Sequence, residues 1–255
     1  MKGNDQNGRD DRHSTRLAVL IDADNASART AAALFEEIAK LGEASLRRIY
    51  GDFTRPHLKG WSDVLSRHAI VPSQSFAYTS GKNASDIALV IDAMDLLHSG
   101  IYDGYCLISS DSDFTRLAQR LREAGAEVYG FGKKTTPESF VQACRRFFYV
   151  ENLGVESPDL LPPPPLRPIA EAEALLRSAI AGLGDEEGWV SAKRLDRAIH
   201  NISPDFDVRG FGEQHLSELA RRTGKFESEK IGTKGYCVRL KPSRRRAPRA
   251  TKPKT

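Results

Sequence analysis

The chain of 255 residues has no apolar run long enough to cross a membrane, and its first 13 residues are polar. A membrane-spanning helix needs about 20 consecutive apolar residues, and a secretory signal needs an apolar core behind its basic start. Both are missing. We therefore expect a cytoplasmic protein that makes no contact with a membrane, with residues 1–13 forming a disordered N-terminus.

Cysteine is scarce: the sequence holds only Cys106, Cys144 and Cys237, and none of them belongs to a CxxC pair. This pattern excludes a disulfide framework and a thiolate zinc site, and it favours free thiols in a reducing compartment. The six histidines form no ligand pair either, so we interpret them as ordinary surface or core residues.

Acidic residues are absent from the last segment, 241–255, which carries seven of the 38 basic side chains. The chain's net charge of +4 therefore comes from this tail, while residues 14–150 are balanced and residues 151–240 are slightly acidic. Such a tail repels itself and is suited to holding phosphates without sequence preference. We predict a disordered tail that binds RNA through Arg244, Arg245 and Arg246; a purely solubilising extension is the alternative.

Short apolar segments alternate with segments of helical spacing across residues 14–150. The pattern predicts strands at 17–21, 46–50, 69–71, 104–109, 126–131 and 147–150, and helices at 27–42, 58–68, 83–100, 114–124 and 137–144. Alternation of this kind is typical of an α/β fold with a mainly parallel sheet. Within helix 83–100 we place the stripe of Ile87, Val90, Ile91, Met94 and Leu97 against the core.

A proline-rich linker, residues 151–168, separates this domain from a second module at 169–240. The second module has helical spacing near 175–180, at 191–202 and at 210–226, and it ends in a hairpin that turns at 232–235. Three helices and a hairpin in so few residues predict a winged helix-turn-helix.

Aspartates gather where the predicted strands end. Asp22 ends the first strand, the stretch "LISSDSDF" places Asp111 and Asp113 directly behind another, and Asp86 begins helix 83–100. The carboxyl ends of parallel strands meet at one edge of a sheet, where ligands bind. Neighbouring carboxylates raise each other's pKa, and Mg²⁺ or Mn²⁺, which prefers oxygen ligands, removes that conflict. We predict that these four acids hold such an ion for phosphodiester hydrolysis.

Each acid also has a structural alternative. Asp22 and Asp24 are suited to a turn or a helix N-cap. Asp111 and Asp113 are suited to capping helix 114–124, although one cap needs one aspartate. Asn25 either orients a metal-bound water or a neighbouring aspartate, or caps helix 27–40.

Two further side chains flank the helix acid. Lys82, four residues before Asp86, either pairs with that carboxylate or contacts substrate phosphate. Asp92, six residues after Asp86, lies about 240° round the helix, so we interpret it as supporting structure.

Three separated blocks, "VLIDADN" (19–25), "GKNASDIALVIDAMDLL" (81–97) and "CLISSDSDFTRLAQRLREAGAEVYGFG" (106–132), resemble the NYN domain of the PIN-like nuclease superfamily in order and spacing. The resemblance implies a Rossmann-like PIN fold and ribonuclease chemistry that depends on a divalent metal. It maps the family's acids onto Asp22, Asp86, Asp111 and Asp113, with Asn25 and Lys82 beside them. Ser110 stands where the family often has glycine, and it adds a hydroxyl next to the substrate.

The second module resembles an OST-HTH or LOTUS domain in "GWVSAKRLDRAI", "RGFGEQHLSELARR" and "FESEKIGTKGYCVRL". That resemblance implies binding of RNA or of a protein partner. Arg221 and Arg222 are our candidates for RNA contact, with a solvated helix face as the alternative.

The combined prediction is a metal-dependent ribonuclease that acts on single-stranded or structured RNA, recruited by the second module and the tail. An RNA-binding or regulatory protein with little or no activity is a second hypothesis from the same domains. A phosphatase of the haloacid-dehalogenase type is a third, because "DAD" follows a strand, but Ala26 stands where that chemistry wants threonine or valine. The sequence leaves the RNA target and the oligomeric state open.

Overall fold

The computed structural model describes residues 14–75, 83–153, 165–184 and 188–241. Backbone contacts divide the chain into two compact units, Met1–Pro165 with Ser203–Asp207, and Leu166–Ile202 with Val208–Thr255. The residues that lie outside the described part are the predicted disordered N-terminus (1–13), Lys82, and residues 242–255 of the predicted tail, which include Arg244, Arg245 and Arg246. Lys241, the first residue of that tail, is described, and its N–H donates to the Lys225 carbonyl at 2.9 Å. No helix within the described ranges is long and apolar enough to span a bilayer.

The first unit is built on a six-stranded sheet in which every neighbouring pair is parallel. Its strand order is β3-β2-β1-β4-β5-β6. The α/β fold and the parallel sheet predicted from the sequence are therefore confirmed. The strands are β1 (Arg16–Asp22), β2 (Glu43–Gly51), β3 (Val71–Gln74), β4 (Gly104–Ile108), β5 (Glu127–Gly132) and β6 (Arg146–Tyr149).

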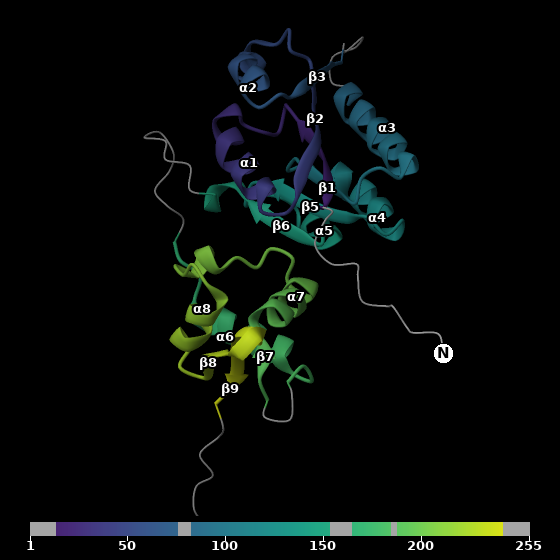
Figure 1. Cartoon of the computed structure of the whole chain (residues 1–255). Coiled ribbons are helices and arrows are strands. Elements are labelled where there is room, and N and C mark those ends of the chain that lie inside the picture. Colours follow the sequence, from purple (N-terminus) through teal and green to yellow (C-terminus); the bar gives the residue numbers. More distant parts are fainter. Residues whose placement is uncertain (1–13, 76–82, 154–164, 185–187, 242–255) are drawn as a thin grey trace, which may run out of the picture. The chain divides into compact units, whose positions relative to one another are not determined.

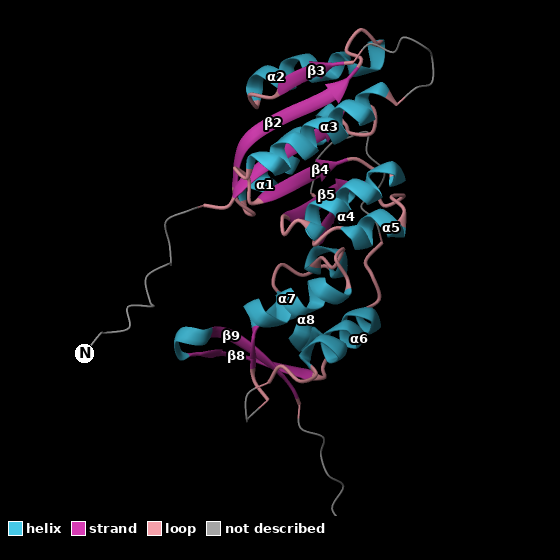
Figure 2. Ribbon diagram, turned by 90° about the vertical axis from the view of Figure 1, so that its right-hand side faces the viewer, coloured by secondary structure: helices cyan, strands magenta, loops and turns pink. Residues whose placement is uncertain are grey.

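Helices cover both faces of this sheet, as Figures 1 and 2 show. One core contains side chains from α1 (Ala31–Ala39) and from the 3₁₀ helix η2 (Pro56–Trp61), which runs into α2 (Ser62–Arg67). The other contains side chains from α3 (Ala84–Ser99), α4 (Thr115–Glu123) and α5 (Glu138–Ala143). Leu17 and Val19 of β1 enter the first core and Ala18 and Leu20 the second. Burial on both faces explains why the central strand is continuously apolar.

The predicted core stripe of α3 is partly wrong. Ile87 is 60% exposed and Ile91 is 56% exposed, whereas the fully buried side chains of the helix are Leu89 and Ala93. Two residues advance a side chain by about 200° round a helix, so Ile91 and Ala93 face nearly opposite directions. Ala93 lies on the buried face of the helix. Because alanine is small, a pattern based on large apolar residues does not include it.

Strand β3 begins at Val71, so the predicted strand at 69–71 overlaps it by one residue. Ala69 has a φ of 50°, in the left-handed region that ends the preceding helix. The chain therefore enters its strand two residues later than the apolar pattern suggests.

The second unit combines three α-helices with a small antiparallel sheet of order β7-β9-β8. Its elements are α6 (Ile169–Ile180), β7 (Val190–Ser191), α7 (Ala192–Ile202), η5 (Val208–Phe211), α8 (Leu216–Arg222), β8 (Phe226–Ile231), η6 (Gly232–Lys234) and β9 (Gly235–Leu240). The predicted third helix, 210–226, is much shorter than expected. Gly212 (φ 81°) and Gly224 (φ 74°) adopt left-handed conformations on either side of α8, which confines the helix between them.

Candidate active site

The two strands at the centre of the sheet, β1 and β4, lie at the point where the strand order reverses. The chain leaves β1 toward α1 on one face and leaves β4 toward α4 on the other. In open parallel sheets this arrangement opens a crevice beyond the carboxyl ends of the two strands. Ile21 pairs with Ile108 in the ladder, so Asp22 and Ser109 come next to each other at the sheet edge.

Asp22 is 1% exposed, and donors from its own chain surround its carboxylate. Oδ2 accepts hydrogen bonds from Ser109 Oγ (2.7 Å) and Asn25 Nδ2 (2.8 Å). Oδ1 accepts from the backbone N–H of Asp24 (3.1 Å) and of Asn25 (3.4 Å). Burial raises the pKa of Asp22, and these hydrogen bonds oppose the rise by favouring the charged form.

The Asn25 amide therefore orients a neighbouring aspartate, one of the two roles considered for it. The alternative role, capping the helix that follows, belongs to Ser27, whose side chain accepts from Arg29 N–H in η1 (Ala28–Thr30).

Ser109 connects the two halves of the site. Its hydroxyl donates to Asp22 and accepts the backbone N–H of Asp111 at 3.0 Å. The serine is 3% exposed, so both bonds are shielded from solvent on the serine side. Ser109 belongs to the stretch "LISSDSDF", but the sequence alone assigns it no role. Its place after β4 was the available signal, because a side chain there sits opposite the end of β1.

Asp111 and Asp113 have different local environments. Asp111 caps the 3₁₀ helix η3 (Ser112–Phe114), with Oδ1 accepting Asp113 N–H at 2.9 Å. Asp113 is exposed, and its Oδ2 accepts from Asn83 Nδ2 at 3.3 Å, just ahead of α3. Asp111 therefore provides the cap, and Asp113 is available for another role.

Asp86 lies in the first turn of α3 and shows that the acids share one electrostatic environment. Its pKa is raised to about 6, first by burial and then by the charges of Asp22, Asp111, Asp24 and Asp113. The structure thus brings together, from three separate segments, the four acids selected from the sequence. We call Asp22, Asp86, Asp111 and Asp113 the acidic cluster.

The donor chemistry of the acidic cluster fits a hard divalent cation, because its side chains offer only oxygen and repel one another without a counter-charge. The spacing is looser than that of a formed metal centre. Within the described ranges, no three His, Cys, Asp or Glu side chains are grouped closely enough to hold one ion.

A histidine also reaches this edge of the sheet, which sequence reasoning missed. His57 Nε2 lies 3.0 Å from Oδ1 of Asp24, two residues after Asp22. The two residues are 33 positions apart in the chain, so a local sequence pattern could not predict their contact.

Several other expected residues have structural contacts. Asp92 accepts from Arg48 (2.7 Å) and Tyr50 (2.8 Å), in keeping with the supporting role expected of it. The Ser110 hydroxyl accepts Lys133 N–H at 2.9 Å and so ties the loop after β4 to the loop after β5.

The two arginines of the second unit differ in their contacts. Arg222 donates to the Phe211 carbonyl (2.6 Å) and to Glu213 (2.9 Å), which holds α8 to η5. Arg221 makes one long contact to the Ser217 carbonyl, at 3.4 Å, and is exposed.

Comparison with known families gives two matches in the expected order. The NYN domain model matches residues 16–152, and the OST-HTH/LOTUS domain model matches residues 167–238. No curated protein matches the chain. A crystal structure of a protein of unknown function from Vibrio parahaemolyticus is similar over 54% of this chain and 94% of its own, with 16% identity and a TM-score of 0.46.

Proposed function

Because the chain belongs to the NYN domain family, whose model matches more than half of it, we propose that it is a ribonuclease that depends on a divalent metal, with the acidic cluster as its active site. The observation that carries this proposal is the joining of Asp22 and Asp111 through one serine hydroxyl. That bridge spans the two central strands at the crevice where this class of sheet binds ligands.

Asp22, Asp86, Asp111 and Asp113 are the residues that would hold Mg²⁺ or Mn²⁺. The ion supplies a water of lowered pKa and stabilises charge on the phosphoryl oxygens and the leaving oxygen. Ser109 and Asn25 keep the Asp22 carboxylate fixed and favour its charged form. Burial and the neighbouring acids raise the pKa of Asp86 to about 6, and a bound cation would favour its charged form.

Recruitment of RNA is assigned to the second unit and to the basic tail. The LOTUS match supports an RNA partner, and the concentrated charge of residues 241–255 suits phosphate binding. We propose Lys82, Ser110, Arg221, Arg222 and Arg244, Arg245 and Arg246 as substrate-binding residues. A protein partner of the LOTUS domain is a further part of this proposal.

A second candidate function, RNA binding or regulation with little cleavage, is favoured by one observation. Over the described part of the chain, the acids do not form a ready-made group of three ligands. The phosphatase hypothesis has less support, because a buried Asp22 that accepts four hydrogen bonds is a poor nucleophile.

Incubation of labelled single-stranded RNA with Mn²⁺ or with EDTA separates these candidates. We expect cleavage in Mn²⁺ only, with 5′-phosphate and 3′-hydroxyl ends, and no cleavage by Asp111→Asn, although that variant still binds RNA. Asp92→Asn is the matched control, since Asp92 contacts Arg48 and Tyr50. Equal cleavage by the parent and Asp111→Asn contradicts the site assignment, and RNA binding without cleavage supports the regulatory function.

A further inference from the structure

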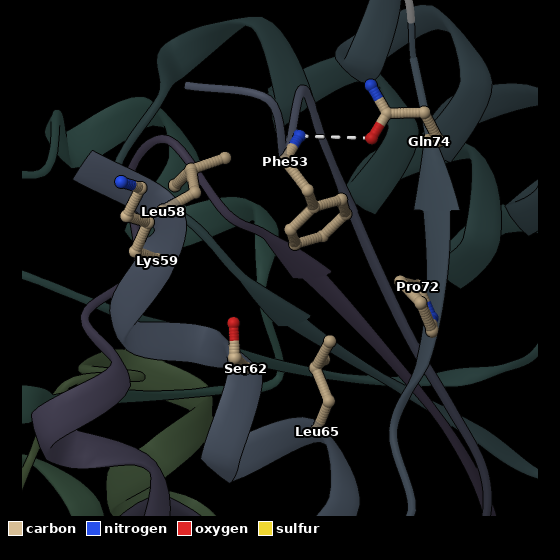
Figure 3. A pocket seen from close by; sticks show the side chains of 7 residues that line it. All are labelled: Phe53, Leu58, Lys59, Ser62, Leu65, Pro72 and Gln74. Carbon is tan, nitrogen blue, oxygen red and sulfur yellow. Dashed lines mark hydrogen bonds between the residues drawn. The ribbon is translucent and has the colours of Figure 1, made fainter. Parts of the chain in front are cut away.

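A cavity of about 240 Å³ opens at the same edge of the sheet as the acidic cluster. It lies between the η2–α2 segment and the carboxyl ends of β2 and β3, as Figure 3 shows. The residues that line it are Phe53, Leu58, Lys59, Ser62, Leu65, Pro72 and Gln74. We call it the Phe53 cavity.

The η2 segment links this cavity to the acidic cluster. Leu58 and Lys59 line the cavity, and the preceding residue, His57, contacts the Asp24 carboxylate at 3.0 Å. The backbone N–H of Asp24 donates to Oδ1 of Asp22, a member of the acidic cluster, at 3.1 Å. A ligand that lies along this edge therefore meets both sites.

The size of the cavity limits its occupant. Small-molecule sites usually enclose about 300–1,000 Å³, so 240 Å³ is too small for a nucleotide cofactor and sufficient for one planar ring system. Leu58, Leu65 and Pro72 surround the Phe53 ring and make the walls largely apolar (Figure 3).

Hydrogen bonds hold the backbone of Phe53 against β3. The backbone N–H of Phe53 donates to Gln74 Oε1 at 3.1 Å, and Gln74 Nε2 donates to Asp52 Oδ1 at 2.9 Å. Arg55 lies 3.5 Å from Asp52 Oδ2 and offsets the charge of that carboxylate. The segment that carries Phe53 is thus tied to the end of β3. Because Arg55 offsets the Asp52 charge, this acid does not repel an anion strongly.

Two polar side chains of the cavity have no partner within the described residues. Ser62 makes no side-chain hydrogen bond there, and its hydroxyl points into the cavity in Figure 3. Lys59 is exposed and makes no ion pair there. One hydroxyl inside an apolar cavity and one cation among its lining residues suit the edge of a base and its phosphate.

We propose that the Phe53 cavity binds one unpaired nucleobase of an RNA strand whose backbone crosses the acidic cluster. The base stacks on the Phe53 ring, Ser62 hydrogen-bonds to its edge, and Lys59 contacts the adjoining phosphate. Only an unpaired base fits, because a base within a duplex is stacked on its neighbours and cannot turn into a pocket. Stacking of this kind tolerates any base, so the site sets strand register more than sequence. The identity of the ligand rests on the proposed function.

The test measures the binding of a fluorescein-labelled RNA octamer to the full chain in EDTA, where no cleavage occurs. A series of octamers carries one abasic nucleotide at each successive position. We expect one position at which the abasic change weakens binding to the parent about tenfold, and we expect Phe53→Ala to weaken binding of the intact octamer by a similar factor. In Phe53→Ala the same abasic change has no further effect, because both changes remove one contact.

Two other variants keep the result clear if Phe53→Ala unfolds. Phe53→Trp retains a stacking face and should keep near-parental affinity, and Phe53→Leu keeps apolar volume and should lose the abasic sensitivity. Phe35→Ala is the matched control, since Phe35 is a partly buried ring that stacks on His68 outside the cavity. Thermal unfolding of each variant accompanies the binding measurement.

The outcomes separate this proposal from the proposed function. The base site is overturned if Phe53→Ala or Phe53→Leu binds the intact octamer as tightly as the parent and shows the same loss of affinity at each abasic position. This holds even if the parent cleaves RNA in Mn²⁺. A parent that fails to cleave but shows the non-additive Phe53 effect overturns the nuclease proposal and supports the base site. A parent that binds none of the octamers overturns the base site directly.

Discussion

Ser109 Oγ lies 2.7 Å from Oδ2 of Asp22 and joins residues that are 87 positions apart in the chain. The same oxygen accepts the N–H of Asp111, so one hydroxyl sets the distance between two acids of the cluster. The buried hydrogen bond also helps Asp22 to stay charged where burial favours the neutral form.

Ser109→Ala should therefore lower both stability and activity. The change removes one of the two hydrogen bonds to Asp22 Oδ2 and the acceptor of the Asp111 N–H. The loss costs about 1–3 kcal/mol of unfolding free energy, and it raises the pKa of Asp22 further. We expect RNA cleavage to fall at least tenfold, as measured by initial rates in Mn²⁺. Ser112→Ala, at an exposed serine two positions before Phe114, is the control and should resemble the parent.

The raised pKa of Asp86 predicts that the stability of the protein in EDTA depends on pH. Its folded-state pKa of about 6 lies above the unperturbed 3.8, so the folded protein binds the proton more tightly than the unfolded chain. The stabilising contribution is complete below about pH 4 and is lost as pH rises to about 6. Asp86→Asn should flatten this part of the urea-derived stability profile and stabilise the protein at pH 7 by roughly 1 kcal/mol, a figure reduced for solvent screening. A profile unchanged by the substitution contradicts the shared electrostatic environment.

A divalent ion should stabilise the folded protein through the same acids. An ion present at 100 times its Kd adds about 2.7 kcal/mol when it binds only the folded state. We expect Mn²⁺ to raise the Tm of the parent and to raise that of Asp111→Asn much less, in thermal scans compared with EDTA. An equal rise in both proteins places the bound ion elsewhere.

Arg221 and Arg222 form a matched pair in the second unit. Arg222→Ala removes the bonds to Phe211 and Glu213 and should destabilise that unit by about 1 kcal/mol. Arg221→Ala should leave stability unchanged and weaken RNA binding.

Trp189 fluorescence in a Trp61→Phe background follows unfolding of this unit, because the chain's two tryptophans lie one in each unit. If Arg221→Ala and Arg222→Ala both bind RNA as tightly as the parent, α8 is not part of the substrate-binding surface.

Truncation at residue 241 should weaken RNA binding and make it less dependent on salt. The seven basic residues of the tail neutralise up to seven phosphates, and each contact contributes about 0.7 to the slope of log K against log salt for a single strand. Measuring RNA affinity of the parent and the truncated chain from about 50 to about 200 mM salt tests the change in slope. A slope that survives truncation means that the folded units provide the phosphate contacts.

The sequence predicted the strands and the gathering of acids at their ends, because burial and the geometry of parallel strands act locally. It did not predict the strand order, which depends on how β4 crosses back to lie beside β1. For the same reason Ser109 and the pair of His57 with Asp24 were missed, since each contact joins residues far apart in the chain.

The exposed isoleucines of α3 illustrate a second limit. Periodicity identifies an apolar face but does not say which arc of a helix meets the sheet. Here Leu89 and Ala93 are buried there instead of Ile87 and Ile91. The Phe53 cavity was missed because three segments must pack before it exists.

The strand order also has a consequence for synthesis. β1, β2 and β3 leave the ribosome before β4, yet β4 must lie beside β1 to complete the sheet. A nascent chain emerges from its N-terminus. A product that stops between residues 86 and 104 therefore carries Asp22 and Asp86 but lacks the strand that brings Asp111 to them. Prematurely terminated chains therefore cannot assemble the cluster, and the site forms only after most of the first unit has been made.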